Sequence, residues 1–422
     1  MTRRISSSIL ALAFLSAAPS ALAFDLRAPF ELESTKVLPA KIRNPRVKNV
    51  FTSITGRFDG VGIEQPLGQK LNKTISWEDL LASQKTDADK AKIIGIRDAA
   101  GLSAGGSPGN TTGEVNVFAH VTAPVLAYGV TDRYTLALAV PVYSVQVNAD
   151  AGFKKSGDGT TFVNKACESD LDKCNESKDK LNNAVNEKLK RLGYQPISNQ
   201  NFTAMADARV VGKFMVSSID RPGVNSSLTL RHEITVPTGK TPDPDNALAV
   251  AVGDGQWDLG AGLIHDLTFD HDLRWNAFGS YLAQLPANMV RRLPTSPTDS
   301  LSADKEMVNV DFGDIVTLGT SLNYEFAGTG FTTGLGYQLQ HMTKAAVKDG
   351  AFTSDRYRLL ENELPARTLH TALLMAGFST VEFYKQKKFV IPMQANLGYS
   401  KAIAGINATT NSMFMAEMVL FF

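Results

Sequence analysis

Apolar and polar residues alternate along the last eleven positions of the chain. One side of the expected strand carries Phe414, Ala416, Met418, Leu420 and Phe422. Glu417 falls on the other side, because side chains of a strand alternate with a period of two. An apolar side for lipid and a polar side for a lumen are typical of a transmembrane barrel strand. The pattern predicts an all-β fold, a transmembrane antiparallel β-barrel.

The same alternation recurs from residue 114 and predicts eleven strands. They span residues 114–127, 134–148, 204–217, 225–237, 256–268, 273–285, 312–326, 331–342, 367–383, 389–400 and 412–422. Short connections are expected at 128–133, 218–224, 269–272, 327–330 and 384–388, and long ones at 149–203, 238–255, 286–311, 343–366 and 401–411. Short periplasmic turns and long extracellular loops are typical of bacterial outer-membrane barrels.

An odd number of strands conflicts with the even number found in single-chain bacterial barrels. Residues 47–62 are the best candidate for a first strand, which makes about twelve and leaves 63–113 as an external loop. The alternative is that residues 24–110 form a plug or a periplasmic extension, with the missing strand elsewhere. The predicted organisation is a signal peptide at 1–23, an N-terminal segment at 24–113 and a barrel at 114–422.

The first 23 residues indicate export. Arg3 and Arg4 precede an apolar run, and Ala21-Leu-Ala23 is a signal-peptidase pattern. No later stretch approaches the roughly 20 consecutive apolar residues of a spanning helix. The chain has 43 basic residues, two of them in the leader, against 42 acidic ones, so the mature formal charge is −1. This charge balance argues against nucleic-acid binding. The export signal and the barrel-type strand pattern together predict the bacterial outer membrane as the location.

Charged residues occupy the predicted inner side of the barrel. They are Arg209, Lys213, Arg231, Glu233, Asp258, Asp266, Arg274, Glu325 and Glu417. Folding the chain about residue 221 places Arg209 opposite Glu233, and folding it about residue 270 places Asp266 opposite Arg274; opposite charges at such positions stabilise a register. These residues either brace the wall as an ion ladder or line a path for substrate, where they would set selectivity.

Apolar residues are interleaved with these charges. The set comprises Phe118, Met205, Val211, Met215, Ile264, Met413, Met415 and Phe421. A partly apolar lumen suits hydrophobic or aromatic solutes better than sugars, although a narrow barrel also needs bulky side chains to fill it.

Two helices are expected in the long loops. Ser76-Trp-Glu-Asp79 resembles a capping box, and Leu181, Val185, Leu189 and Leu192 form a helical stripe that Gly193 would end. Cys167 and Cys174 are the only cysteines, and in an exported chain they predict a disulfide that stiffens the longest loop.

Catalysis and metal binding have little support in the sequence. The histidines are His120, His232, His265, His271, His341 and His370, and none lies in a local nucleophile motif. They are interpreted as surface or turn residues. Asp243, Asp245 and Asp254 could hold a divalent cation, but a plain Asp/Pro/Gly loop is the simpler interpretation. No catalytic residue, metal site or cofactor is predicted.

Two motifs resemble a known family. Residues 128–142, YGVTDRYTLALAVPV, look like a hairpin of the outer-membrane barrels named for the meta-pathway of phenol degradation. Residues 236–240 (VPTGK) and 253–262 (GDGQWDLGAG) are similar to that family's turn into the next strand. The resemblance covers residues 114–422 and implies a transporter, distantly like fatty-acid and aromatic uptake channels.

The sequence thus predicts a channel for passive uptake of small hydrophobic or aromatic molecules. The expected partners are outer-membrane lipids, lipopolysaccharide, the solute and, through Phe422, the barrel-assembly machinery. The competing hypothesis is a non-conducting structural or interaction barrel whose loops contact lipopolysaccharide or a partner. A barrel that hydrolyses lipid is the third possibility, and it would require a nucleophile and a base on neighbouring strands.

Overall fold

The computed structural model describes residues 33–72, 74–82, 86–168, 184–270, 272–297, 301–348 and 350–422. The predicted signal peptide, Cys174, Leu181 and His271 lie outside these residues. The Cys167–Cys174 disulfide therefore stays a prediction.

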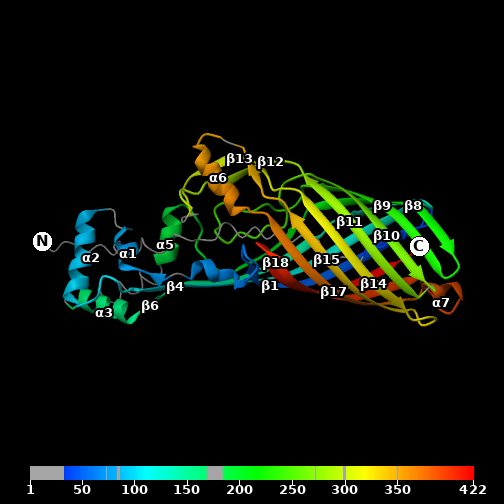
Figure 1. Cartoon of the computed structure of the whole chain (residues 1–422), viewed down its shortest axis with the longest axis horizontal. Helices are drawn as coiled ribbons and strands as arrows, with labels where there is room; N and C mark the ends of the chain where they lie inside the picture. The colour runs from blue at the N-terminus through cyan, green and yellow to red at the C-terminus, as the bar shows by residue number, and fades with distance from the viewer. Residues whose placement is uncertain are drawn as a thin grey trace.

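Twelve membrane-spanning segments form a closed antiparallel barrel, which confirms the predicted fold class (Figure 1). β1 closes the ring because its Val50 lies opposite both Val121 and Met415. The strands are β1 (Arg43–Phe58), β4 (Gly109–Thr131), β5 (Tyr134–Ala139) continued by β6 (Val142–Lys155), β7 (Gln200–Met205) continued by β8 (Ala208–Arg221), β9 (Val224–Val236), β10 (Asp258–Phe269), β11 (Leu273–Gln284), β14 (Ile315–Glu325), β15 (Phe331–Met342), β17 (Arg367–Ser379), β18 (Met393–Ile406) and β19 (Thr409–Leu420).

Predicted strand ends differ from the observed ones at several places, of which the first strand and two connections matter most. The first strand was expected at 47–62, and β1 spans Arg43–Phe58. The long connection expected at 401–411 is instead a tight turn, because Asn407 adopts a left-handed φ of 54° that asparagine tolerates. The short connection expected at 384–388 is longer and contains helix α7 (Val381–Lys385).

Two neighbouring strands are interrupted at the same level of the wall. β5 gives way to β6 at Pro141, which has no backbone N–H to donate to a ladder. Next to it, β7 gives way to β8 after Ala206, whose amide donates to the Pro141 carbonyl. The wall stays closed here, because β5 pairs with β8 below the interruption and β6 pairs with β7 above it.

The outer side of the barrel is apolar, with aromatic residues near both ends. Exposed outward residues include Leu126, Leu230, Leu263, Leu318, Leu335, Leu374 and Leu397. Phe269, Phe326, Phe331 and Phe389 lie near the short turns, and Trp257, Tyr281, Tyr337 and Tyr399 lie toward the long loops. This is the apolar band with two aromatic belts expected of an outer-membrane barrel. Among the described residues, no helix is long and apolar enough to cross a membrane.

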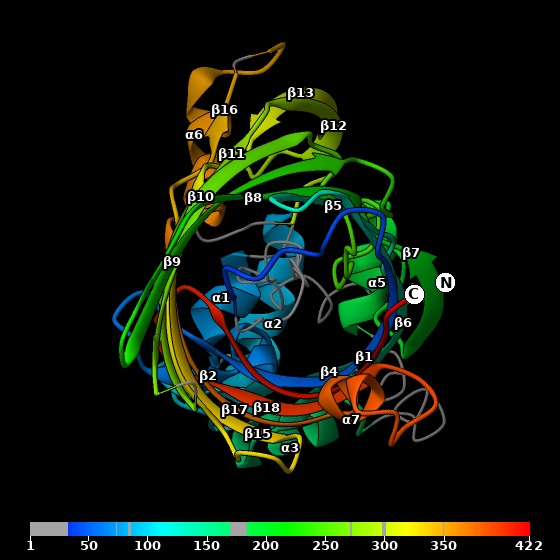
Figure 2. The same ribbon diagram turned by 90° about the vertical axis from the view of Figure 1, so that its right-hand side faces the viewer.

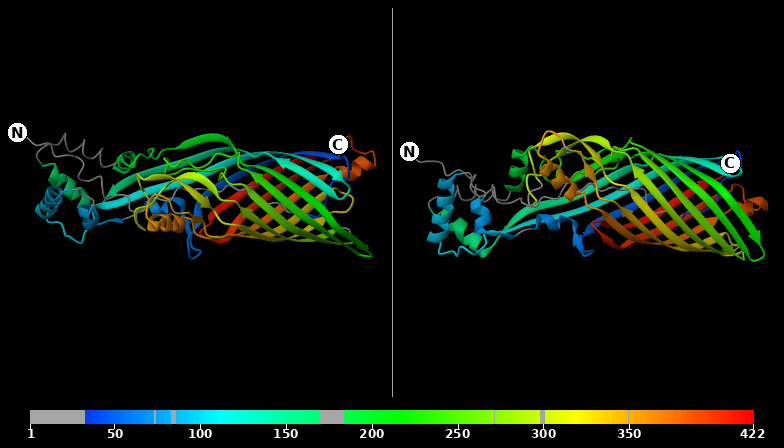
Figure 3. Two further views of the ribbon diagram at one scale, coloured as in Figure 1. Left: turned by 90° about the horizontal axis from the view of Figure 1, so that it is seen from above. Right: turned by 45° about the horizontal axis from the view of Figure 1, so that its top comes forward.

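A small helical head stands at the far end of the β4–β6 hairpin, away from the barrel (Figure 3). It contains α1 (Trp77–Ala82), α2 (Asp87–Ala99) and α3 (Gly157–Ala166), and β3 (Thr74–Ile75) leads into it. β2 (Glu64–Pro66) pairs with β1, and η2 (Leu67–Leu71) packs on the barrel, where Leu67 and Leu71 join its apolar core. The predicted capping box is confirmed, because the Asp79 amide donates to Ser76 Oγ and the Ser76 amide donates to Asp79 Oδ2. Trp77 packs against Phe162 in the centre of the head, with 5.0 Å between the ring centroids.

A second group of elements lies over the long-loop end. It consists of α5 (Ala184–Arg191), β12 (Ala287–Arg292), β13 (Lys305–Asp311), β16 (Ala346–Val347) and α6 (Ser354–Glu363). The last four share an apolar core that includes Leu293, Val310 and Leu360. Gly193 follows α5 with a φ of 78°, as predicted for a helix end.

Candidate functional site

The predicted lumen charges all occupy inner positions of the wall. Arg209 and Lys213 lie on β8, Arg231 and Glu233 on β9, Asp258 and Asp266 on β10, Arg274 on β11, Glu325 on β14 and Glu417 on β19. On each of these strands they alternate with the exposed apolar residues of the outer side. The charges therefore gather mainly on the adjacent strands β8 to β11, which we call the charged face.

The predicted pairing of Arg209 with Glu233 is wrong by two residues. Glu233 lies opposite Val211, and Arg209 lies opposite Thr235. The cause is a β8–β9 turn that ends at the Arg221–Val224 pair, combined with a bulge between Met215 and Ser217. Both changes keep the side chains on their predicted face. Arg209 therefore still reaches Glu233 diagonally, with 3.7 Å between Nη1 and Oε1.

The predicted pairing of Asp266 with Arg274 is wrong in the same way. Asp266 lies opposite Asn276, because the β10–β11 hairpin closes at Phe269 and Leu273. Asn276 Nδ2 donates to Asp266 Oδ1 at 2.6 Å. An amide thus takes the position expected for a cation.

Residues 33–42, which precede β1, run inside the barrel, and we call them the N-terminal strap (Figure 2). At the short-turn end, the Lys41 amide donates to the Gly129 carbonyl and the Leu38 amide donates to Thr135 Oγ1. Deeper in the lumen, Thr35 donates to Asp266 Oδ2 through both its amide and its hydroxyl, at 2.9 and 2.8 Å. The strap therefore covers the charged face.

Glu33 joins the strap to an ion network on the wall. Lys213 Nζ lies 2.7 Å from Glu33 Oε2, and Arg231 Nε lies 3.4 Å from Oε1. Arg231 also binds Glu233 at 2.6 Å, and Glu233 is 6% exposed. Carboxylates and cations thus alternate through the network. Partly buried charges are tolerated in a protein interior when they are paired in this way.

The remaining predicted lumen charges lie outside this network. Lys36 of the strap lies in the electrostatic field of Arg274 and Glu325. Glu417 accepts from Asn396 Nδ2 at 2.9 Å and lies 3.8 Å from Arg46 of β1. Asp258 accepts from Gln284 Nε2 at 3.3 Å.

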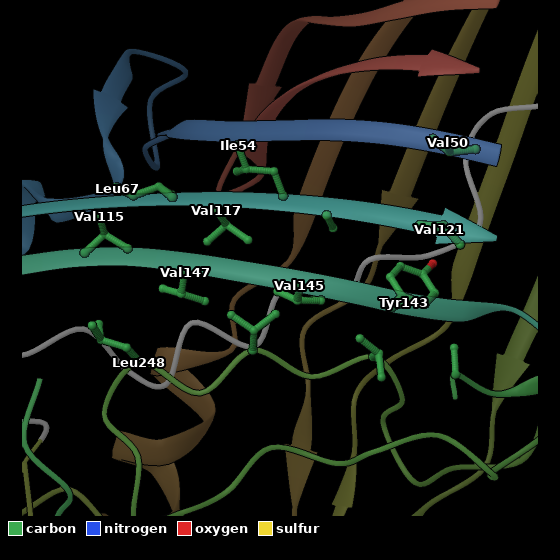
Figure 4. Close-up of a cluster of buried hydrophobic side chains, with 14 of the residues drawn as sticks. Val50, Ile54, Leu67, Val115, Val117, Val121, Tyr143, Val145, Val147 and Leu248 are labelled. Carbon is green, nitrogen blue, oxygen red and sulfur yellow. The ribbon is translucent and has the colours of Figure 1, made fainter. Parts of the chain in front are cut away.

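The part of the lumen wall that adjoins the charged face is apolar. It is formed by inner residues of β1, β4 and β6, and we call it the apolar face (Figure 4). Its members include Val50, Ile54, Val115, Val117, Val121, Tyr143, Val145 and Val147. On β4 every second residue from Val115 to Val121 is buried, so small β-branched side chains and alanine line the inside.

Two of the apolar residues predicted for the lumen are on the wrong side. Phe118 is 43% exposed and Met205 is 44% exposed on the outer surface. Phe118 shares its side of β4 with the polar residues Asn116, His120 and Thr122, whereas valines and Ala119 occupy the inner side, so polarity indicated the wrong side for the lumen. Val211, Met215, Ile264, Met413 and Met415 occupy inner positions as predicted.

A loop covers the apolar face. Residues 239–253, which we call the lumen loop, bring Leu248, Val250 and Val252 into the same core cluster as Val145 and Val147. Every residue from 247 to 253 is buried. The sequence interpretation missed this loop because it treated 238–255 as an external connection. The signal was present as the run Ala247-Leu-Ala-Val-Ala-Val252, which is too apolar for an exposed loop.

The described histidines lie on the outer side of the wall, as surface residues. His232 bonds the Tyr134 hydroxyl at 3.0 Å, and His370 bonds the Tyr337 hydroxyl at 2.6 Å. His265 bonds Ser226 Oγ at 3.1 Å. Within the described ranges, no three His, Cys, Asp or Glu side chains are grouped so as to hold a metal ion. Asp243 and Asp245, considered above as cation ligands, instead accept from Gln195 and from Arg292 and Lys305.

No protein-family model and no curated protein sequence matches the chain. Among solved structures, the COG4313 outer membrane channel from Pseudomonas putida F1 is similar, with a TM-score of 0.52 at 11% identity, covering 93% of this chain and 100% of that chain. The chain has the fold of an outer-membrane channel. Its closed barrel and apolar outer band place it in the bacterial outer membrane.

Two further structures are similar at lower scores. A FadL homologue from Pseudomonas aeruginosa has a TM-score of 0.31 at 8% identity, covering 100% of this chain and 99% of that chain. The toluene transporter TbuX from Ralstonia pickettii has a TM-score of 0.33 at 10% identity, covering 91% and 90%. Both scores are too low to carry an argument. The resemblance to the phenol meta-pathway family has no support from a family model and stays a prediction.

Proposed function

We propose that the protein is a channel for passive uptake of small hydrophobic or aromatic molecules. The observation that carries this proposal is the apolar face, a continuous inner surface of valines and Tyr143 on β1, β4 and β6. Sugars and ions gain nothing from such a surface, whereas an apolar solute loses little on leaving the outer leaflet for it. The polar surface of lipopolysaccharide resists apolar solutes, so a protein path would speed their uptake.

The charged face would then act in two ways. Its ion network holds the N-terminal strap and braces strands β8 and β9. Arg209, Lys213 and Arg231 also place positive charge beside the path, which favours aromatic acids over neutral or cationic solutes of the same size. These residues are proposed to set selectivity and not to perform chemistry.

Vesicles with lipopolysaccharide in the outer leaflet test this function. The reconstituted protein should speed the uptake of radiolabelled toluene and of benzoate, while glucose should cross no faster than in protein-free vesicles. Arg231→Ala should slow benzoate and leave toluene unchanged, because it removes a lumen cation and keeps the apolar face. Uptake of toluene and benzoate at the protein-free rate would refute the channel.

The helical head favours one competing function. It projects from the barrel on the extended β4–β6 hairpin (Figure 1), and a passive channel has no evident need of it. A barrel that contacts lipopolysaccharide or a protein partner would present such a head. Shortening the hairpin to remove the head should leave toluene uptake intact if the protein is a channel. Loss of cell-surface binding with no uptake in either form would support the interaction barrel.

A further inference from the structure

We propose that the apolar face beneath the lumen loop is a binding site for an apolar solute, and that the solute occupies it by displacing Leu248, Val250 and Val252. This inference rests on the proposed channel function and names the step at which the channel recognises its solute. The three loop side chains supply the apolar contacts that a small aromatic or alkyl molecule would supply in their place.

The loop has the form of a flap with one narrow base. Gly239 and Gly253 cross so closely that a Cβ on Gly253 would lie 2.7 Å from Gly239 Cα. Asp207 holds this crossing, since its Oδ1 accepts from the Gly239 amide at 2.8 Å and its Oδ2 accepts from the Asp254 amide at 3.4 Å. A loop with adjacent ends can move as a unit about its base.

The tip of the flap is fastened by polar contacts at the long-loop end. Asp245 accepts from Arg292 at 2.6 Å and from Lys305 at 2.9 Å. Next to it, Asn246 and Gln200 exchange two amide hydrogen bonds. We call these contacts the latch. The Asp245 and Lys305 side chains are 35% and 40% exposed, so water can replace their contact at modest cost.

The middle of the flap is held by apolar packing. Leu248, Val250 and Val252 lie among Val145, Val147 and Ala206, and the residues between them are alanines. Lifting the flap therefore exposes valines of both the loop and the wall to water. An apolar solute that covers the wall offsets this cost, and a sugar does not. Displacement is thus favoured only by solutes of the matching chemistry, because a ligand shifts a conformational equilibrium by its differential affinity for the two states.

A cysteine in the wall reports on the flap directly. Val147 is 0% exposed beneath Leu248 (Figure 4) and can be replaced by Val147→Cys, after Cys167→Ser and Cys174→Ser remove the native thiols. N-ethylmaleimide should modify Cys at this position slowly. Asp245→Asn, which removes the charge of the latch, should speed the reaction roughly tenfold, the order expected for one charge-assisted contact. Leu248→Ala should speed it through lost packing, so that two independent variants test the flap. Unchanged rates in both would overturn the proposal.

Protection by solute tests the binding site itself. In the Asp245→Asn protein, saturating toluene should slow modification at position 147 several-fold, and glucose should not. The matched control is Ser280→Cys on the inner side of β11, where toluene should have no effect. Equal protection at both positions, or none at 147, would overturn the site.

Both assays are independent of transport, so the two proposals fail separately. Protection at position 147 without toluene uptake in vesicles would leave a binding site in a non-conducting barrel. Uptake without protection would leave a channel whose path avoids the apolar face, and this inference would be wrong.

Discussion

Lys213 of β8 donates a hydrogen bond of 2.7 Å to Glu33, a residue that precedes the first strand by ten positions. The contact ties the N-terminal strap to the middle of the barrel wall. Since Arg231 lies on the other carboxylate oxygen, one acidic side chain separates two cations that would otherwise repel each other.

Glu33→Gln should weaken the strap. The change leaves Lys213 and Arg231 with less compensation in a partly buried site, which should cost about 1–3 kcal/mol. Heat-induced unfolding in detergent, followed by circular dichroism, measures the loss. Single-channel conductance should rise if the strap then leaves the lumen. Glu382→Gln is the matched control, because the Glu382–Lys385 pair is exposed on α7 and should contribute almost nothing. Equal effects of the two substitutions would contradict the proposed role.

Sequence alone was sufficient for the barrel and insufficient for what lies inside it. Two-residue alternation identified the strands, because each has one side in lipid and one in the lumen. Glu33 and Thr35 belong to no such pattern; they bind residues about 180 to 230 positions away. The lumen loop was missed for a related reason, because its burial depends on β4 and β6. The exact pairing of Arg209 required a bulge that alternation does not reveal.

Gly212→Ala should destabilise the outer wall between β5 and β9. A Cβ at this position would lie 2.1 Å from His232 Nε2 and 2.8 Å from the Tyr134 hydroxyl, so the Tyr134–His232 hydrogen bond could not form as it does. Overpacking of this kind costs about 1–3 kcal/mol. Gly279→Ala is the control, because its Cβ would meet the flexible end of Leu318 at 3.2 Å and backbone no nearer than 4.0 Å. Thermal unfolding of the two variants, measured side by side, tests this. Equal stability of the two variants would count against overpacking at position 212.

Acid should release the latch. The hydrogen bond from Lys305, followed by that from Arg292, holds the pKa of Asp245 below its ordinary value of 3.8. A lowered folded-state pKa adds stability that is present above the unfolded value and is lost as the pH falls through the folded one. Pepsin should therefore cut the Asp245→Asn protein faster than the unchanged protein near pH 4. The difference in cleavage rate should vanish at lower pH, where residue 245 is uncharged in both proteins. A difference that persisted at the lowest pH would exclude Asp245 as the group that titrates.

Phe422→Ser should impair assembly in the cell and spare the folded barrel. The backbone of Phe422 exchanges two hydrogen bonds with Arg43 and keeps them in the variant, while its side chain is 64% exposed. The proposed contact with the assembly machinery depends on that exposed ring. Less folded protein should reach the outer membrane, as measured by heat-modifiable migration on gels, whereas refolding into detergent should be unchanged. Phe326→Ser, an exposed aromatic at the same end, is the control. Normal assembly of the Phe422 variant would dismiss the proposed contact.

Arg292→Lys should loosen the long-loop end although it keeps the charge. The Arg292 guanidinium donates to the carbonyls of Pro244, Leu192, Gly193 and Ser302 and to Asp245, and it stacks 3.8 Å from the centroid of Tyr194. A lysine ammonium has three donors and no plane, so it cannot satisfy these acceptors together.

Buried carbonyls left without donors should cost about 2–4 kcal/mol of local stability. Limited proteolysis should therefore cut the segments around residues 192 and 244 faster in this variant than in the unchanged protein. Arg358→Lys on the exposed side of α6 provides the comparison, with no change in cleavage expected. Because the same guanidinium holds Asp245, Arg292→Lys should also speed maleimide modification at position 147. Faster cleavage without faster modification would show that Arg292 stabilises the long loops but does not hold the flap closed.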